Sequence, residues 1–152
     1  MSGNIPGIFM DPIGVIHSPF TEKSQTPIQA SRSQAKGTVE IYPEFAKGLQ
    51  DLEGFSHIFL LYTFHESSGY ALVVKPFLDD QLHGVFATRY PCRPNQIGLS
   101  VVRLLSCNGN ILEIEGIDML DGTPLLDIKP YVPEFDIRAG THDGWYATRS
   151  NK

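Results

Sequence analysis

The sequence predicts a mainly β protein, a small barrel or sandwich of about seven or eight strands with one short helix. Short runs rich in β-branched and aromatic residues recur along the chain, and 14 glycines and 11 prolines separate them at fairly regular spacing. Strand patterns do not alternate with long helical patterns, which argues against a parallel α/β sheet. A chain of 152 residues, 41% of them hydrophobic, is large enough to bury one core.

The first half of the chain contains the predicted helix and the most apolar predicted strand. Residues 13–18 and 37–42 alternate between two faces, as strands do. A helix is predicted over residues 43–52, because a proline opens it, apolar residues follow at helical spacing, and Gly54 comes just after it. Residues 55–64 are largely apolar on both faces and predict a central buried strand.

The second half predicts a hairpin and several shorter strands. Residues 97–107 and 111–117 flank the turn signal Asn108-Gly109-Asn110 and are predicted to pair as the hairpin. The shorter strands are predicted over residues 70–74, 84–88 and 125–128.

Residues 11–136 are predicted to form one folded domain. Residues 1–10 are interpreted as a loosely ordered N-terminus and residues 137–152 as a C-terminal tail. Within the domain, residues 20–36 are mostly polar and follow neither periodicity, so they predict a long loop. A loop of this length in a compact domain is usually functional or disordered.

Charge and motif content exclude several classes of protein. The net charge of −5 gives no overall basic footprint, so an RNA substrate requires a local patch and no DNA partner is expected. G-x-G-x-x-G, P-loop, H-E-x-x-H, C-x-x-C and G-x-S-x-G patterns are all missing from the sequence. Cys92 and Cys107 do not make a disulfide framework or a zinc site, and no metal is expected. The longest apolar stretch, residues 58–64, is too short to cross a membrane, and a cytoplasmic location is expected.

Two polar clusters lie in or near the predicted strands. Arg89 and Arg93 stand four residues apart beside prolines, and their planar guanidinium groups suit a carboxylate or a phosphate. Pairing with surface acids explains these arginines equally well. His65 and Glu66 end the central strand, where a histidine beside a carboxylate can serve as a base or binding group, or form an ordinary polar pair.

A third cluster is the turn-rich stretch 116–131, which holds three aspartates together with Lys129 and Tyr131. Its carboxylates and backbone amides could line a pocket that binds an amino group or ribose hydroxyls. Alternatively, its aspartates cap turns by accepting backbone hydrogen bonds, and for Asp121 alone this is the simpler interpretation.

These stretches resemble the TsaA-like (TrmO) family of tRNA methyltransferases. Several strings match in family order and span most of the chain between Asp11 and Asp136, which is far more specific than any single glycine or aspartate motif. The strings are IGVIHSP at 13–19, GFSH at 54–57, GVFATR at 84–89, RPNQIGLS at 93–100 and LDGTPLLDIKPY at 120–131.

The resemblance implies a single-sheet β-barrel, antiparallel or mixed, and an enzyme that uses S-adenosylmethionine. Members of this family methylate the exocyclic amine of threonylcarbamoyl-adenosine beside the tRNA anticodon, and the resemblance also implies a homodimer. Two alternatives stay open: a barrel that senses S-adenosylmethionine without methylating RNA, and a methyltransferase for a substrate other than tRNA.

The resemblance also implies, position by position, which residues contact the cofactor. The early loop departs from the family, since many bacterial relatives have Pro-Arg-Gln where this chain has Pro27-Ile28-Gln29. The implied cofactor contacts are Pro27, Ile28, Gln29, His65, Glu66, Arg89, Leu99, Leu120, Asp121, Gly122 and Thr123.

Methyl transfer to an adenine amine needs positioning and help with the departing proton. His65 and Tyr131 are the candidate catalytic residues. The expected positive patch for the substrate comprises Lys75, Arg93 and Lys129, with Arg89 beside them.

Overall fold

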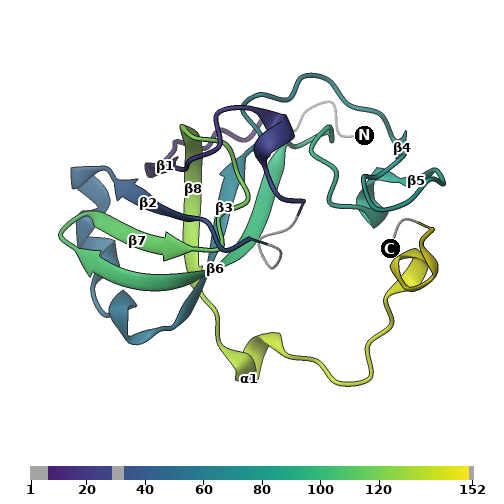
Figure 1. Cartoon of the computed structure of the whole chain (residues 1–152). Helices are drawn as coiled ribbons and strands as arrows, with labels where there is room; N and C mark the ends of the chain where they lie inside the picture. Colours follow the sequence, from purple (N-terminus) through teal and green to yellow (C-terminus); the bar gives the residue numbers. More distant parts are fainter. Residues whose placement is uncertain (1–6, 29–32, 151–152) are drawn as a thin grey trace.

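A computed structural model of the chain describes residues 7–28 and 33–150. Its main element is a closed barrel in which the strands follow the order β1-β2-β7-β6-β3-β8 and every neighbouring pair is antiparallel (Figure 1). This confirms the predicted single-sheet barrel. The barrel strands are β1 Gly14–His17, β2 Lys36–Ile41, β3 His57–Thr63, β6 Ile97–Asn108, β7 Ile111–Glu115 and β8 Thr123–Pro130.

Alternation along the strands explains how the barrel encloses its core. In β3, Ile58, Leu60 and Tyr62 are buried while the residues between them are half-buried. In β6, every second residue from Gly98 to Leu104 is buried and those between are exposed. Successive strand residues point to opposite faces, so one apolar set from each strand fills the interior.

The remaining strands lie outside the barrel. Between β3 and β6, residues 64–96 leave the barrel wall, and we call this segment the excursion. It contains β4 Val73–Val74 and β5 His83–Gly84, which pair as a separate two-stranded sheet, and the 3-10 helix η5 Val85–Ala87. The predicted strands over residues 70–74 and 84–88 are therefore too long, because only this short pairing is available to them.

The predicted helix over residues 43–52 is wrong in type and extent. Residues there form two 3-10 helices, η3 Pro43–Leu49 and η4 Leu52–Gly54. Asp51 separates them with a φ of 70°, a left-handed conformation that an α-helix cannot contain. The α-helix in the described chain, α1 Pro133–Asp136, instead follows β8.

The C-terminal tail returns to the excursion. After α1, the chain runs past the barrel to the 3-10 helix η6 Gly144–Thr148, which lies beside β5 in Figure 1. A further 3-10 helix, η1 Lys23–Gln25, lies in the predicted long loop. No helix in the described part of the chain is long and apolar enough to cross a membrane.

Candidate functional site

Most of the predicted cofactor contacts meet at one end of the barrel. β3 finishes there at Thr63, which pairs with Ile97 at the start of β6. β8 begins at the same end, because Tyr62 of β3 pairs with Leu125. Residues 63–66, 95–99 and 117–123 therefore surround this end, which we call the barrel mouth.

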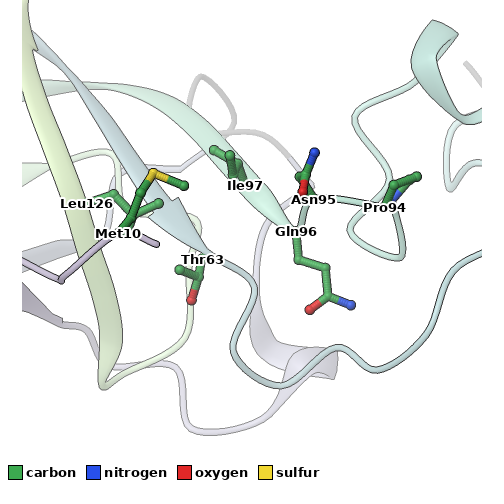
Figure 2. Close-up of a pocket in the computed structure, with 7 residues that line it drawn as sticks. All are labelled: Met10, Thr63, Pro94, Asn95, Gln96, Ile97 and Leu126. Carbon is green, nitrogen blue, oxygen red and sulfur yellow. The ribbon is translucent and has the colours of Figure 1, made fainter. Parts of the chain in front are cut away.

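A hollow of about 320 Å³ opens at the mouth (Figure 2), a volume within the range of small-molecule sites. Gln96 ties its rim to the excursion, because its side-chain amide donates a hydrogen bond of 3.3 Å to the Gly69 carbonyl. His65 and Leu99 each lie two residues beyond a lining residue, Thr63 and Ile97 respectively. The hollow is lined by Met10, Thr63, Pro94, Asn95, Gln96, Ile97 and Leu126.

Asp121 is held by the end of β1. Its Oδ1 accepts a hydrogen bond of 3.0 Å from the Ser18 backbone N–H and lies 3.6 Å from His17 Nδ1. The turn-capping interpretation thus describes the contacts of this carboxylate. Gly122 follows with a φ of 82°, which favours glycine, and its N–H donates to the Ile16 carbonyl at 2.8 Å.

Thr123, a neighbour of Asp121, uses its hydroxyl in a hydrogen bond within its own segment. Thr123 is only 2% exposed, and its hydroxyl donates a bond of 2.6 Å to the Leu120 carbonyl. Leu120 itself is half-buried. The backbone N–H groups of Asp121 and Thr123 are committed as well, to the carbonyls of Phe20 and Leu120. In this segment the Leu120 side chain is therefore better placed for a ligand than these donors.

The early loop reaches the start of the excursion. Lys23 donates a hydrogen bond of 3.0 Å from its Nζ to the Glu66 carbonyl, beside the exposed His65. Pro27 is half-buried and Ile28 is 41% exposed. The predicted contact Gln29 lies outside the described residues.

Arg89 and Arg93 have different environments, although they stand four residues apart. Arg89 is exposed. Arg93 donates from one guanidinium nitrogen to the carbonyls of Thr88 at 2.9 Å and Tyr90 at 3.0 Å. Its guanidinium thus braces the backbone on both sides of Arg89.

The sequence analysis did not predict a series of hydrogen-bonded polar side chains that lies inside the mouth. Tyr62, which is 4% exposed, places its hydroxyl 2.8 Å from Ser100 Oγ, and Ser100 donates at 2.7 Å to Asp118 Oδ1. Because the Ser100 proton goes to a carboxylate, the proton between Tyr62 and Ser100 comes from Tyr62. The alternation of β3 and β6 does place a tyrosine and a serine in an otherwise apolar interior, which was the available signal.

Arg89 and Asp118 lie close enough to Tyr62 for their charges to change its pKa. Burial raises the pKa of Tyr62 well above its ordinary value, and the Asp118 charge adds to that rise. The hydrogen bond between Tyr62 and Ser100 and the positive charge of Arg89 act in the opposite direction. A cation and an anion therefore both lie within electrostatic reach of the Tyr62 hydroxyl.

The structure does not bring Tyr131 and Lys129 to the mouth of the same chain. The Tyr131 N–H donates to the His57 carbonyl at the beginning of β3, and Tyr131 is six positions after Leu125 along the chain. At about 3.3 Å per residue, this places Tyr131 roughly 20 Å along the barrel from the mouth. Lys129 pairs with Asp127 at 3.3 Å on the outer surface.

The remaining predicted substrate residue, Lys75, is exposed between β4 and β5 of the excursion. Among residues 7–28 and 33–150, no three His, Cys, Asp or Glu side chains gather as metal ligands would.

Comparison with known proteins gives the same family as the sequence strings. Residues 15–137 match the model of the tRNA-methyltransferase O N-terminal domain. A probable S-adenosyl-L-methionine-binding protein of Pyrococcus abyssi is 57% identical over 93% of this chain and 77% of its own length. The human tRNA (adenine(37)-N6)-methyltransferase is 39% identical over 85% of this chain. A crystal structure of TrmO from Pseudomonas aeruginosa superposes with a TM-score of 0.78 at 43% identity, over 93% of this chain.

The longer relatives extend beyond the matched region. This chain spans 31% of the human protein and 62% of the Pseudomonas chain. The barrel and its mouth are thus the part that these proteins have in common with it.

Proposed function

Because the chain belongs to the tRNA-methyltransferase O N-terminal domain family, we propose that it uses S-adenosylmethionine to methylate the exocyclic amine of threonylcarbamoyl-adenosine next to the tRNA anticodon. The main observation in support is the barrel mouth, where the segments around His65, Leu99 and Asp121 lie at one end of the barrel and a hollow lined by Thr63 and Ile97 opens beside them. The relatives named as S-adenosyl-L-methionine-binding proteins and tRNA methyltransferases agree with this assignment.

The residues at the mouth fit the cofactor by their chemistry. The methionine end of S-adenosylmethionine carries a carboxylate and an ammonium group, and Arg89 and Asp118 offer the opposite charges. Leu99, which is 45% exposed, offers an apolar wall for the adenine. When bound, the cofactor supplies a methyl group activated by the positive charge on its sulfur. Arg89 would bind and orient the carboxylate, and the half-buried Leu120 would add an apolar contact.

His65 is the proposed proton acceptor within one chain. It is exposed at the mouth, and a neutral imidazole can take up a proton near neutral pH. Tyr131, the second catalytic candidate, lies at the far end of the same barrel and would reach a mouth only from a second copy.

We propose a homodimer on the outer face of β3 and β6. Val101 of β6 is 37% exposed there, opposite Phe59 of β3, and Leu99 lies on the same face at the edge nearest the mouth. Exposed apolar side chains grouped on one sheet face are typical of an interface. Mixing a His65→Ala variant with a Tyr131→Phe variant tests the arrangement, because shared sites would restore part of the activity. A monomeric mass in solution would contradict it.

The tRNA contact is proposed to centre on the excursion. Lys75, Arg89 and Arg93 lie on this segment and are the proposed positive patch on a chain whose net charge is −5. Phosphate contacts made by such a patch weaken as salt is added. The target base has to leave its stack to enter the hollow, as single-stranded RNA bases do when they are read. A cytoplasmic location accords with this substrate and stays a prediction.

A labelling experiment tests the proposed function. The protein is incubated with S-adenosylmethionine labelled on the methyl group and with bulk tRNA, which is then digested to nucleosides. Label in methylated threonylcarbamoyl-adenosine is the expected result. Cofactor binding without label in tRNA would favour a sensor or another substrate, and no binding would overturn the proposal.

A further inference from the structure

The tail after α1 is fastened to the excursion by Trp145. The indole ring stacks on His83 with centroids 4.3 Å apart and planes 14° from parallel. The indole N–H also donates a hydrogen bond of 2.8 Å to the Ala87 carbonyl. One side chain thus contacts both β5 and the end of η5.

A second anchor lies at the end of the tail. Asp79 is only 5% exposed, and its Oδ1 accepts bonds from the Ser150 N–H at 3.0 Å and the Ser150 hydroxyl at 2.8 Å. Its Oδ2 accepts a bond of 2.7 Å from His83 Nε2. A buried carboxylate requires such donors, and the tail provides two of them. The Trp145 and Asp79 contacts share His83, so residues 144–150 are fixed to the excursion as one unit, which we call the clamp.

The sheet of the excursion is short. It consists of two residues in each strand, and an isolated two-stranded pair is only marginally stable in water. Arg89 follows Ala87 by two residues in this segment. Trp145 holds the Ala87 carbonyl, while Arg93 holds those of Thr88 and Tyr90. The backbone around Arg89 is therefore fixed by two side chains: Arg93 holds the carbonyls on both sides of Arg89, and Trp145 of the tail holds the carbonyl one residue further back.

The clamp lies outside the segment that the family model matches, which ends at residue 137. We propose that Trp145 is a positioning residue that acts through the Ala87 carbonyl to hold Arg89 in place for the cofactor carboxylate. This inference rests on the proposed function, because it gives Arg89 a ligand. Trp145 itself is not among the residues that line the hollow.

The first test replaces Trp145 by phenylalanine. Trp145→Phe keeps an aromatic ring for His83 but loses the N–H donor to Ala87. Loss of one hydrogen bond should weaken S-adenosylmethionine binding about three- to tenfold in calorimetry, while the midpoint of thermal unfolding stays close to that of the unchanged protein. His142→Ala, an exposed position in the same tail, is the matched control and should leave the affinity unchanged.

A double-mutant cycle separates positioning from a general structural effect. If Trp145 acts through Arg89, Trp145→Phe should cost no further affinity in a chain that already carries Arg89→Ala. Additive losses, or unchanged affinity in Trp145→Phe, would overturn the inference. Ser150→Ala gives a second, milder way to loosen the clamp and should weaken binding in the same non-additive manner.

Docking of the tail can be followed by tryptophan fluorescence, because Trp145 is the single tryptophan of the chain. Its fluorescence should shift towards that of a solvent-exposed indole in Asp79→Ala, and an unchanged spectrum would contradict the clamp. If the unchanged protein binds no S-adenosylmethionine, the proposed function fails and the positioning role falls with it. If it binds normally while Trp145→Phe binds equally well, only the positioning role fails.

Discussion

The Ser100 hydroxyl donates a hydrogen bond of 2.7 Å to Asp118 Oδ1 and thereby ties the interior of β6 to the segment that leads into β8. Tyr62 completes the chain from β3, at 2.8 Å from the same serine oxygen. Three segments of the mouth are thus joined by two side-chain bonds inside an apolar barrel, where such bonds are strongest and their loss is most costly.

Replacement of Ser100 by alanine should destabilise the protein by about 1–3 kcal/mol, because Tyr62 and Asp118 would each lose a buried partner. The measurement is the free energy of unfolding in urea. Ser106→Ala is the matched control on the same strand: Ser106 Oγ is buried and has no hydrogen-bond partner among the described residues. Its removal should be neutral or stabilising, and equal losses in both variants would contradict a role for the Tyr62–Ser100–Asp118 chain.

Replacement of Gly98 by alanine should displace the Tyr62 ring. A Cβ at Gly98 would lie 2.2 Å from Tyr62 Cε2, closer than any real contact. Overpacking of this kind costs about 1–3 kcal/mol, which thermal unfolding can measure. Gly48→Ala in η3 has no atom within 4 Å of the added carbon and should change stability little. A Gly98→Ala variant of unchanged stability would show that the ring can move at no cost.

Replacement of Arg89 by alanine should weaken S-adenosylmethionine binding about tenfold or more, which corresponds to roughly 1.4 kcal/mol or greater. The lost interaction is a charge-assisted bond to the cofactor carboxylate. Arg103→Ala is the control, since Arg103 is 62% exposed and lies 3.9 Å from Glu115 towards the other end of β6. Unchanged calorimetric affinity in Arg89→Ala would remove this residue from the site.

The clamp should lose stability in acid. The backbone N–H of Ser150 is the largest cause that holds the pKa of Asp79 well below its ordinary value, and the bonds from His83 and the Ser150 hydroxyl add to it. Asp80 lies beside them and also accepts a bond from Ser150. A pKa lowered in the docked state gives stability that is present above the ordinary pKa of about 4 and is lost as the pH falls below it.

Trp145 fluorescence recorded as the pH falls from neutrality measures this loss. The indole should become exposed below about pH 4 in the unchanged protein. Asp79→Asn should remove that step, because an amide does not titrate. A step of the same size and midpoint in Asp79→Asn would mean that another group controls the release of the tail.

Local patterns predicted a barrel or sandwich because each strand of the barrel carries its own signal, and the family resemblance favoured the barrel. The alternation of residues 97–107 became β6, and the Asn108-Gly109-Asn110 turn joins it to β7 as predicted. The matching strings predicted the family, which the domain match confirms. The prediction of an α-helix over residues 43–52 was wrong because the apolar spacing there fits a 3-10 helix as well. The left-handed backbone of Asp51 cannot be predicted from composition.

The sequence by itself determined a mainly β fold of barrel or sandwich type, and its motif strings determined the family and the single-sheet barrel that the family implies, since alternation, turns and motif strings are local properties of the chain. Tertiary structure alone decided three further relationships: the bond from Ser100 to Asp118, the distance of Tyr131 from the mouth, and the docking of Trp145 on the excursion. Each depends on strand register or on a contact between segments far apart along the chain. The energy of such a contact appears only when folding brings both partners together.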